Sequence, residues 1–97
     1  MNFREALTED RRLTILRLLA ESAGYSANQY LLQTALGQFA HNVSMDVLRS
    51  DIAWLNEQGL VHAKETAGVM VPIMSERGLD VSRGVATVPG VKRPAPE

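Results

Sequence analysis

Residues 44–81, SMDVLRSDIAWLNEQGLVHAKETAGVMVPIMSERGLDV, contain the clearest succession of structural signals in the chain. The segment begins with Ser44, a good N-cap because its hydroxyl can accept a hydrogen bond from an unpaired N–H at the start of a helix. The apolar residues that follow recur at the spacing of one helix face, and they are Met45, Leu48, Ile52 and Leu55. Gly59 readily adopts the left-handed conformation that ends many helices. We therefore predict a helix between Ser44 and Gly59.

The second half of this stretch has the pattern of a β-hairpin. Residues 60–65 and 69–74 read as strands, and the glycine-containing residues 66–68 between them read as a tight turn. Ser75 can then cap a short helix that continues to about Arg83. The stretch as a whole predicts helix, strand, turn, strand and helix.

Two more helices are predicted before residue 44. The first has Thr8 as a candidate cap, although the helix could also begin before Thr8, and it ends at Gly24. Its apolar stripe includes Leu13, Leu16 and Ala20. The second begins at Ser26, whose hydroxyl would form a capping box with the side chain of Gln29. This second helix ends in the break at residues 40–43.

The complete predicted order is three helices, a hairpin and a last helix. A lone two-stranded hairpin is only marginally stable in water, so this one must pack against the helices. Three helices followed directly by a hairpin form the winged-helix layout. The run DIAWLNEQGLV, the turn and SERG resemble the third helix, wing and last helix of the winged helix-turn-helix superfamily. We predict a mainly α fold with a small β-hairpin, consisting of a three-helix core, a two-stranded wing and a short C-terminal helix.

Nearly the whole chain also resembles a family of small proteins encoded in Mu-like phages and prophages. The segments that carry this resemblance are RRLTILRLLAE, GYSANQYLLQTAL, SDIAWLNEQGLV and VPGVKRPAP. Such proteins are often described as arsenic-repressor-like regulators because of their fold, and a fold does not specify a function. The metal-sensing arsenic repressors use clusters of cysteine or histidine, which this chain lacks. We therefore expect no metal sensing.

The length of 97 residues suits one domain. We assign residues 1–86 to the winged-helix domain and residues 87–97, which contain three of the four prolines, to a flexible tail. No apolar run is long enough to cross a membrane, so we expect a protein of the bacterial cytoplasm without a membrane partner.

The sequence offers little material for catalysis. It has no cysteine, which excludes disulfides and thiolate metal sites, and His41 and His62 do not have metal-ligand spacing. We expect His41 to be a surface or loop-packing residue. No phosphate-binding glycine loop and no nucleophile with a histidine and an acid can be recognised. We predict a protein that is not an enzyme and has no cofactor or metal.

The winged-helix resemblance implies a DNA-binding surface, since the third helix of such a domain enters the major groove while the wing contacts the backbone or the minor groove. The candidate residues are Asn42, Ser44, Arg49 and Ser50 around the third helix, Lys64 on the wing, and Lys92 and Arg93 in a basic arm.

Simpler roles remain open for several of these residues. Ser44 would serve only as a cap, and Arg49 would pair with Asp46 or Glu57 on an ordinary solvated helix face. Trp54 would pack beneath the wing or mark a surface for a partner, because tryptophan is favoured in interface hot spots.

Two functions remain open. The first is a phage or prophage transcriptional regulator that binds double-stranded DNA, as a dimer formed through the first helix and the C-terminal segment. The net charge of −1 and the pI near 6.1 count against it, because duplex binders gain much of their affinity by neutralising phosphates. The second is an interaction or assembly module that binds a phage protein. The near-neutral charge, the acidic residues on the third helix and the proline-rich tail favour this second function.

Overall fold

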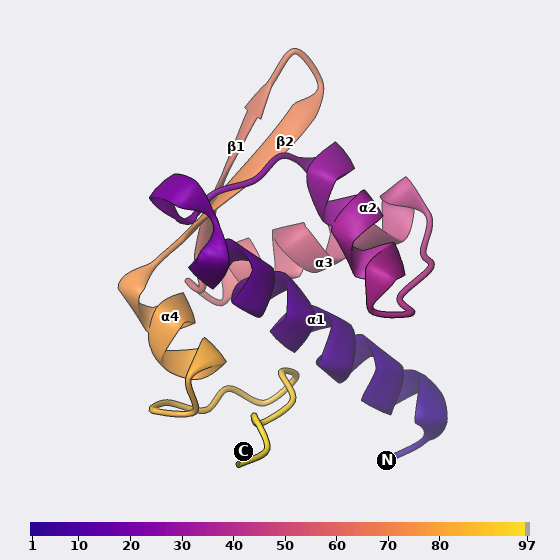
Figure 1. The fold of residues 1–97 in the computed structure, drawn as a ribbon, viewed down its shortest axis with the longest axis vertical. Helices are drawn as coiled ribbons and strands as arrows, with labels where there is room; N and C mark the ends of the chain where they lie inside the picture. Colours follow the sequence, from indigo (N-terminus) through magenta and orange to yellow (C-terminus); the bar gives the residue numbers. More distant parts are fainter. Residues whose placement is uncertain (97) are drawn as a thin grey trace.

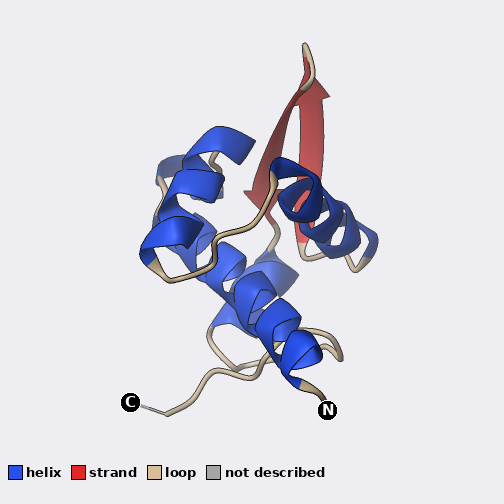
Figure 2. Ribbon diagram, turned by 90° about the vertical axis from the view of Figure 1, so that its right-hand side faces the viewer, coloured by secondary structure: helices blue, strands red, loops and turns tan. Residues whose placement is uncertain are grey.

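The computed structural model describes residues 1–96. Within them, four α-helices and one antiparallel hairpin follow the predicted order, and their bounds are α1 (Phe3–Glu21), α2 (Gln29–Gln38), α3 (Met45–Glu57), β1 (Val61–Thr66), β2 (Val69–Met74) and α4 (Glu76–Ser82). A short 3-10 helix, Ala23–Tyr25, lies between α1 and α2. The hairpin projects from one end of the helical body, and both chain ends lie toward the other (Figures 1 and 2). The prediction of a mainly helical fold with a small hairpin is confirmed.

Hydrogen bonds and backbone angles confirm the predicted ends of α3 and the predicted cap of α4. The Ser44 hydroxyl accepts a hydrogen bond from the Val47 N–H at 3.2 Å, and the Ser75 hydroxyl accepts one from the Gly78 N–H at 3.0 Å. Gly59 follows α3 with a φ of 74°, the left-handed conformation expected of it. In the hairpin, Val61–Thr66 pairs with Val69–Met74. β1 therefore begins and ends one residue later than predicted.

Thr8 is not the cap of α1, because the helix extends before it, the alternative that the sequence left open. Asn2 is the cap, and its side chain accepts a hydrogen bond from the Glu5 N–H at 2.8 Å. Thr8 lies inside the helix, where its hydroxyl donates to the Arg4 carbonyl at 3.1 Å. The helix also ends earlier than predicted, at Glu21. Gly24 has the expected left-handed φ of 66°, but it lies in the following 3-10 helix.

The start of α2 was also predicted at the wrong residue. Asn28 is the cap, and its side-chain oxygen accepts hydrogen bonds from the Tyr30 and Leu31 N–H groups, each at 2.9 Å. Ser26 instead forms an isolated β-bridge with Ile73, which holds the chain before α2 against β2. The capping box is therefore absent, and the Gln29 side chain is available for a tertiary contact.

One hydrophobic core joins the helices to the base of the hairpin. Its buried residues are Leu13, Ile15, Leu16 and Leu19 of α1, Leu32 and Leu36 of α2, Leu48, Ile52 and Leu55 of α3, Leu60, Val61 and Met74 at the hairpin, Val81 of α4, and Val88 and Val91. The stripe predicted for α3 faces this core, so the opposite side of α3 faces solvent. None of the described helices is both long and apolar enough to cross a membrane.

The C-terminal segment packs more closely than we predicted. It has no helix or strand after Ser82, as expected of a tail, yet Val88 and Val91 are buried in the core. The Lys92 N–H donates to the Glu9 carbonyl at 3.1 Å, so the segment also lies alongside α1. The packed body therefore extends at least to Val91 rather than ending at residue 86.

Candidate interaction face

A buried glutamine joins α2, α3 and the hairpin. The Gln29 side-chain oxygen accepts hydrogen bonds from the Met70 N–H at 2.7 Å and from the Arg49 guanidinium at 2.6 Å. Arg49 also donates to the Gly68 carbonyl at 3.2 Å and forms an ion pair with Glu65. The hairpin is thus tied to both helices.

This junction changes the interpretation of Arg49. Its ion-pair partner is Glu65 of β1 rather than Asp46 or Glu57, the partners considered in one of the two roles left open by the sequence. A guanidinium has five N–H donors, and here they reach a carboxylate, an amide oxygen and a backbone carbonyl. A hydrogen bond from Arg49 to a DNA base would therefore compete with the contacts by which Arg49 positions the hairpin.

The outer side of α3 carries acidic and small residues. Asp46, Ser50, Ala53 and Glu57 are exposed and spaced 4, 3 and 4 residues apart, so they form one stripe opposite the core. We call these four residues the α3 stripe. It contains two carboxylates and no lysine or arginine, and no part of residues 1–96 buries it.

The other predicted site residues fall into two groups. Asn42 is exposed in the turn before α3, and Lys64 is exposed on β1. Lys92 and Arg93 belong to the C-terminal segment, away from the hairpin (Figure 1), and Lys92 forms an ion pair with Asp10 at 3.3 Å. The structure therefore places the expected basic arm apart from the hairpin that carries Lys64.

The sequence segment directly before the α3 stripe carries no charged residue. Residues 22–45 contain no Asp, Glu, Lys or Arg. Within this segment, Tyr30 and Leu31 of α2 are 55% and 62% exposed, and Val47 of α3 is exposed just beyond it. A surface helix without any charged residue is unusual, because the solvated side of a helix is normally polar and charged.

A buried ion cluster holds α3 on α1, and sequence reasoning missed it. Asp51 is only 3% exposed and forms ion pairs with Arg11 and with Arg12, the latter at 3.2 Å. The Arg12 guanidinium also lies 3.9 Å from the centroid of the Trp54 ring and donates to the Gly90 carbonyl at 3.1 Å. Trp54 thus packs against α1 and the C-terminal segment, rather than beneath the hairpin, which was one of the two roles that the sequence left open.

A second polar cluster joins α1, the turn before α3 and the C-terminal segment. His41 is buried, as a loop-packing residue would be, and its Nε2 lies 2.7 Å from the Asp10 carboxylate. Partial burial by itself raises the pKa of Asp10. Hydrogen bonds from His41 and Lys92 outweigh that effect, and the pKa lies below its usual value of 3.8. Nowhere in residues 1–96 do three or more metal-ligating side chains come together.

The chain has two close relatives of similar length. It is 49% identical over 92 residues to the uncharacterized protein gp26 of Escherichia phage Mu, and the match covers 95% of each chain. The chain belongs to the family of this phage Mu protein. Another member of the gp26 family, an uncharacterized protein of Haemophilus influenzae, is 38% identical over 98 residues, which cover 100% of this chain and 95% of the relative.

The comparisons confirm the predicted relationship to Mu-like phages. No protein-family model matches the chain, and no solved structure matches it. The likeness to arsenic repressors therefore stays a prediction. Neither relative's name states a partner or a reaction.

Proposed function

We propose that this gp26-family chain is a winged-helix domain that binds a protein partner through the exposed sides of α2 and α3. The order of the elements and the projecting hairpin support the winged-helix assignment. One observation carries the choice of partner: the exposed residues of α2 and α3 include no lysine or arginine.

This charge distribution disfavours duplex DNA as the partner. Duplex DNA carries one negative charge per about 1.7 Å of its axis, and its binders gain affinity by neutralising several phosphates. Asp46 and Glu57 on the α3 stripe would repel phosphates, and the charge of Arg49 is already opposed by Glu65. Lys64 alone would be left to contribute a positive charge from the neighbouring hairpin.

The uncharged part of this surface, on α2 and the adjoining start of α3, has the composition of the core of a protein interface. The cores of protein interfaces are depleted of charged residues and enriched in aromatic residues. Exposed Tyr30, Leu31 and Val47 would supply the apolar contacts of such a core. The Gln29–Arg49 junction would hold α2, α3 and the hairpin in one arrangement, which lowers the entropy cost of binding.

A photo-crosslinking amino acid at position 31 tests the proposal in cells that produce the Mu-like phage. We expect one phage-encoded protein to be crosslinked from position 31 and not from position 85, an exposed site near α4. The purified pair should bind each other, and Leu31→Asp should abolish binding while Val85→Asp leaves it unchanged. Equal binding by the Leu31→Asp variant would refute the proposed surface.

A DNA-binding regulator is the second candidate, and the exposure of Lys64 on the projecting hairpin favours it. In that case Asn42, Ser44 and Ser50 would lie nearest the bases, and Lys64 would contact the backbone. Fluorescence anisotropy with duplex fragments that cover the phage genome, at low salt, distinguishes the two functions. A sequence-specific complex that is weakened by both Lys64→Glu and Ser50→Glu would replace the protein-binding proposal.

A further inference from the structure

The first two turns of α1 and the residues just before them expose large apolar side chains. Met1 and Phe3 are 84% and 78% exposed, and Leu7 is also exposed. All residues from Met1 to Glu5 are exposed, so this start of the helix has little tertiary support. Helix ends without such support fray. Contact with another surface would therefore stabilise this end of α1.

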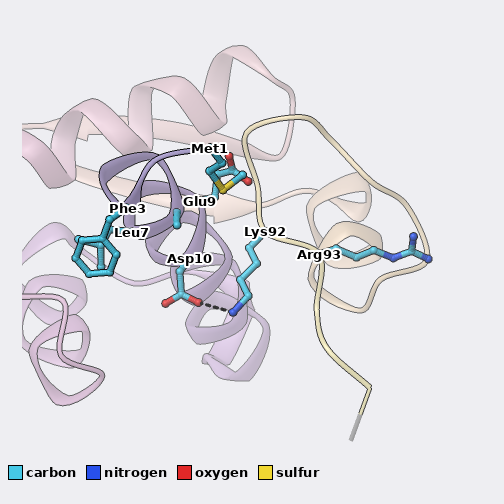
Figure 3. Close-up of a pocket in the computed structure, with 8 residues that line it drawn as sticks. Met1, Phe3, Leu7, Glu9, Asp10, Lys92 and Arg93 are labelled. Carbon is cyan, nitrogen blue, oxygen red and sulfur yellow. Dashed lines mark hydrogen bonds and ion pairs between the residues drawn. The ribbon is translucent and has the colours of Figure 1, made fainter.

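These side chains lie beside a hollow. Its volume is about 470 Å³, and its apolar wall includes Met1, Phe3 and Leu7. The other wall belongs to the C-terminal segment, where Lys92 reaches across to Asp10 (Figure 3). A protruding aromatic ring and a hollow able to accept one thus occupy a single patch of the surface.

The charges around the hollow are of both signs. Lys92 is paired with Asp10, whereas Glu9 and Arg93, which also line the hollow, form no ion pair within residues 1–96. In a two-fold symmetric dimer, the same patch meets itself and each contact occurs twice. A contact between Glu9 of one copy and Arg93 of the other would then occur at two equivalent places.

We propose that a second copy of this chain covers the patch, with Phe3 of each copy inserted in the hollow of the other. The Phe3 ring fits the hollow and Glu9 is opposite in charge to Arg93, so the patch is complementary to itself under a two-fold rotation. The exposed sides of α2 and α3 take no part in this contact. The dimer is therefore independent of the function proposed above.

Sedimentation velocity of the purified full chain, from micromolar to millimolar concentration, tests the dimer. We expect a reversible monomer–dimer equilibrium in which Phe3→Asp raises the dissociation constant by at least about tenfold, equivalent to 1.4 kcal/mol. The matched control Val85→Asp, at a site that is 74% exposed and outside the hollow, should leave the constant unchanged. Circular dichroism of each variant verifies that it is folded.

A charge exchange between copies tests the two-fold arrangement. Glu9→Arg alone and Arg93→Glu alone should each weaken the dimer, because each sets like charges against each other at both contacts. An equal mixture of the two variants should form a mixed dimer, since opposite charges then meet at both contacts. A chain that stays monomeric throughout, a dimer insensitive to Phe3→Asp, or a mixture that fails to associate would overturn the proposal.

Discussion

Replacing Asp51 with asparagine tests whether the buried ion cluster holds α3 on α1. The carboxylate is almost fully buried, and both of its partners, Arg11 and Arg12, come from α1. Asp51→Asn has nearly the same shape but no charge. The substitution would leave two guanidinium groups close together in a poorly solvated site without their counter-charge.

The expected loss of stability is large for a chain of this size. A hydrogen bond to a charged group contributes about 1.5–3 kcal/mol, and Asp51 accepts one from each arginine. Removing one partner from a buried ion pair costs about 3–5 kcal/mol. We expect Asp51→Asn to lower the free energy of unfolding by about 3 kcal/mol, the lower end of this range, because the asparagine oxygen can still accept a hydrogen bond.

Urea unfolding followed by circular dichroism measures this change directly. Domains of 60–100 residues lose about 4–8 °C of Tm for each kcal/mol, so thermal unfolding should show a decrease of at least about 12 °C. The matched control is Asp46→Asn, an exposed carboxylate on the same helix. Asp46→Asn should lower the free energy of unfolding by no more than about 1 kcal/mol, which is what a carboxylate contributes near a helix N-terminus.

The refuting result is a loss by Asp51→Asn that is no greater than the loss by Asp46→Asn. Such a result would mean that Asp51 is well solvated in solution and that the apolar core alone holds α3 on α1. An unchanged urea dependence of the unfolding free energy is needed for the comparison, since a changed slope would indicate a different extent of unfolding.

Two further predictions concern the C-terminal segment and Asp10. Gly90→Ala should destabilise the protein by about 1–3 kcal/mol, because Gly90 has a φ of 101° and an added Cβ would lie 2.5 Å from the Trp54 ring. Trp54 is the only tryptophan, so its fluorescence should change as well, whereas Gly68→Ala, with a φ of 78° and no neighbour within 4 Å, should leave the emission unchanged. Asp10→Asn should reduce stability at neutral pH, and its difference from the unsubstituted chain should shrink as the pH falls below 3.8. The sign follows from the lowered pKa, since a carboxyl group with a depressed native pKa stabilises the fold above its unfolded pKa and loses that contribution as it is protonated. A difference between the two chains that stays constant from neutral pH to acid would contradict this second prediction.

Some candidate residues could be found from the sequence and others could not. Ser44 was recognised as a cap because the cap chemistry acts over three residues. Arg49 was recognised as an important cation, but its partner Glu65 was not, since the two are 16 residues apart and meet only when the hairpin folds back toward α3. The absence of charge from residue 22 to residue 45 is visible in the sequence, and it becomes informative once Tyr30 and Leu31 are known to be exposed.

By itself, the sequence determined the order of the elements, the face of α3 that enters the core and the ends of α3 and α4. These features depend on caps, glycines and periodic apolar residues, whose effects extend over a few neighbouring residues. Tertiary structure alone decided that Asp51 meets Arg11, 40 residues away, and that Arg12 meets Gly90, 78 residues away. It also buried Val88 and Val91 in a segment with no periodic pattern, because burial in an irregular segment depends on the surface that the rest of the chain presents to it.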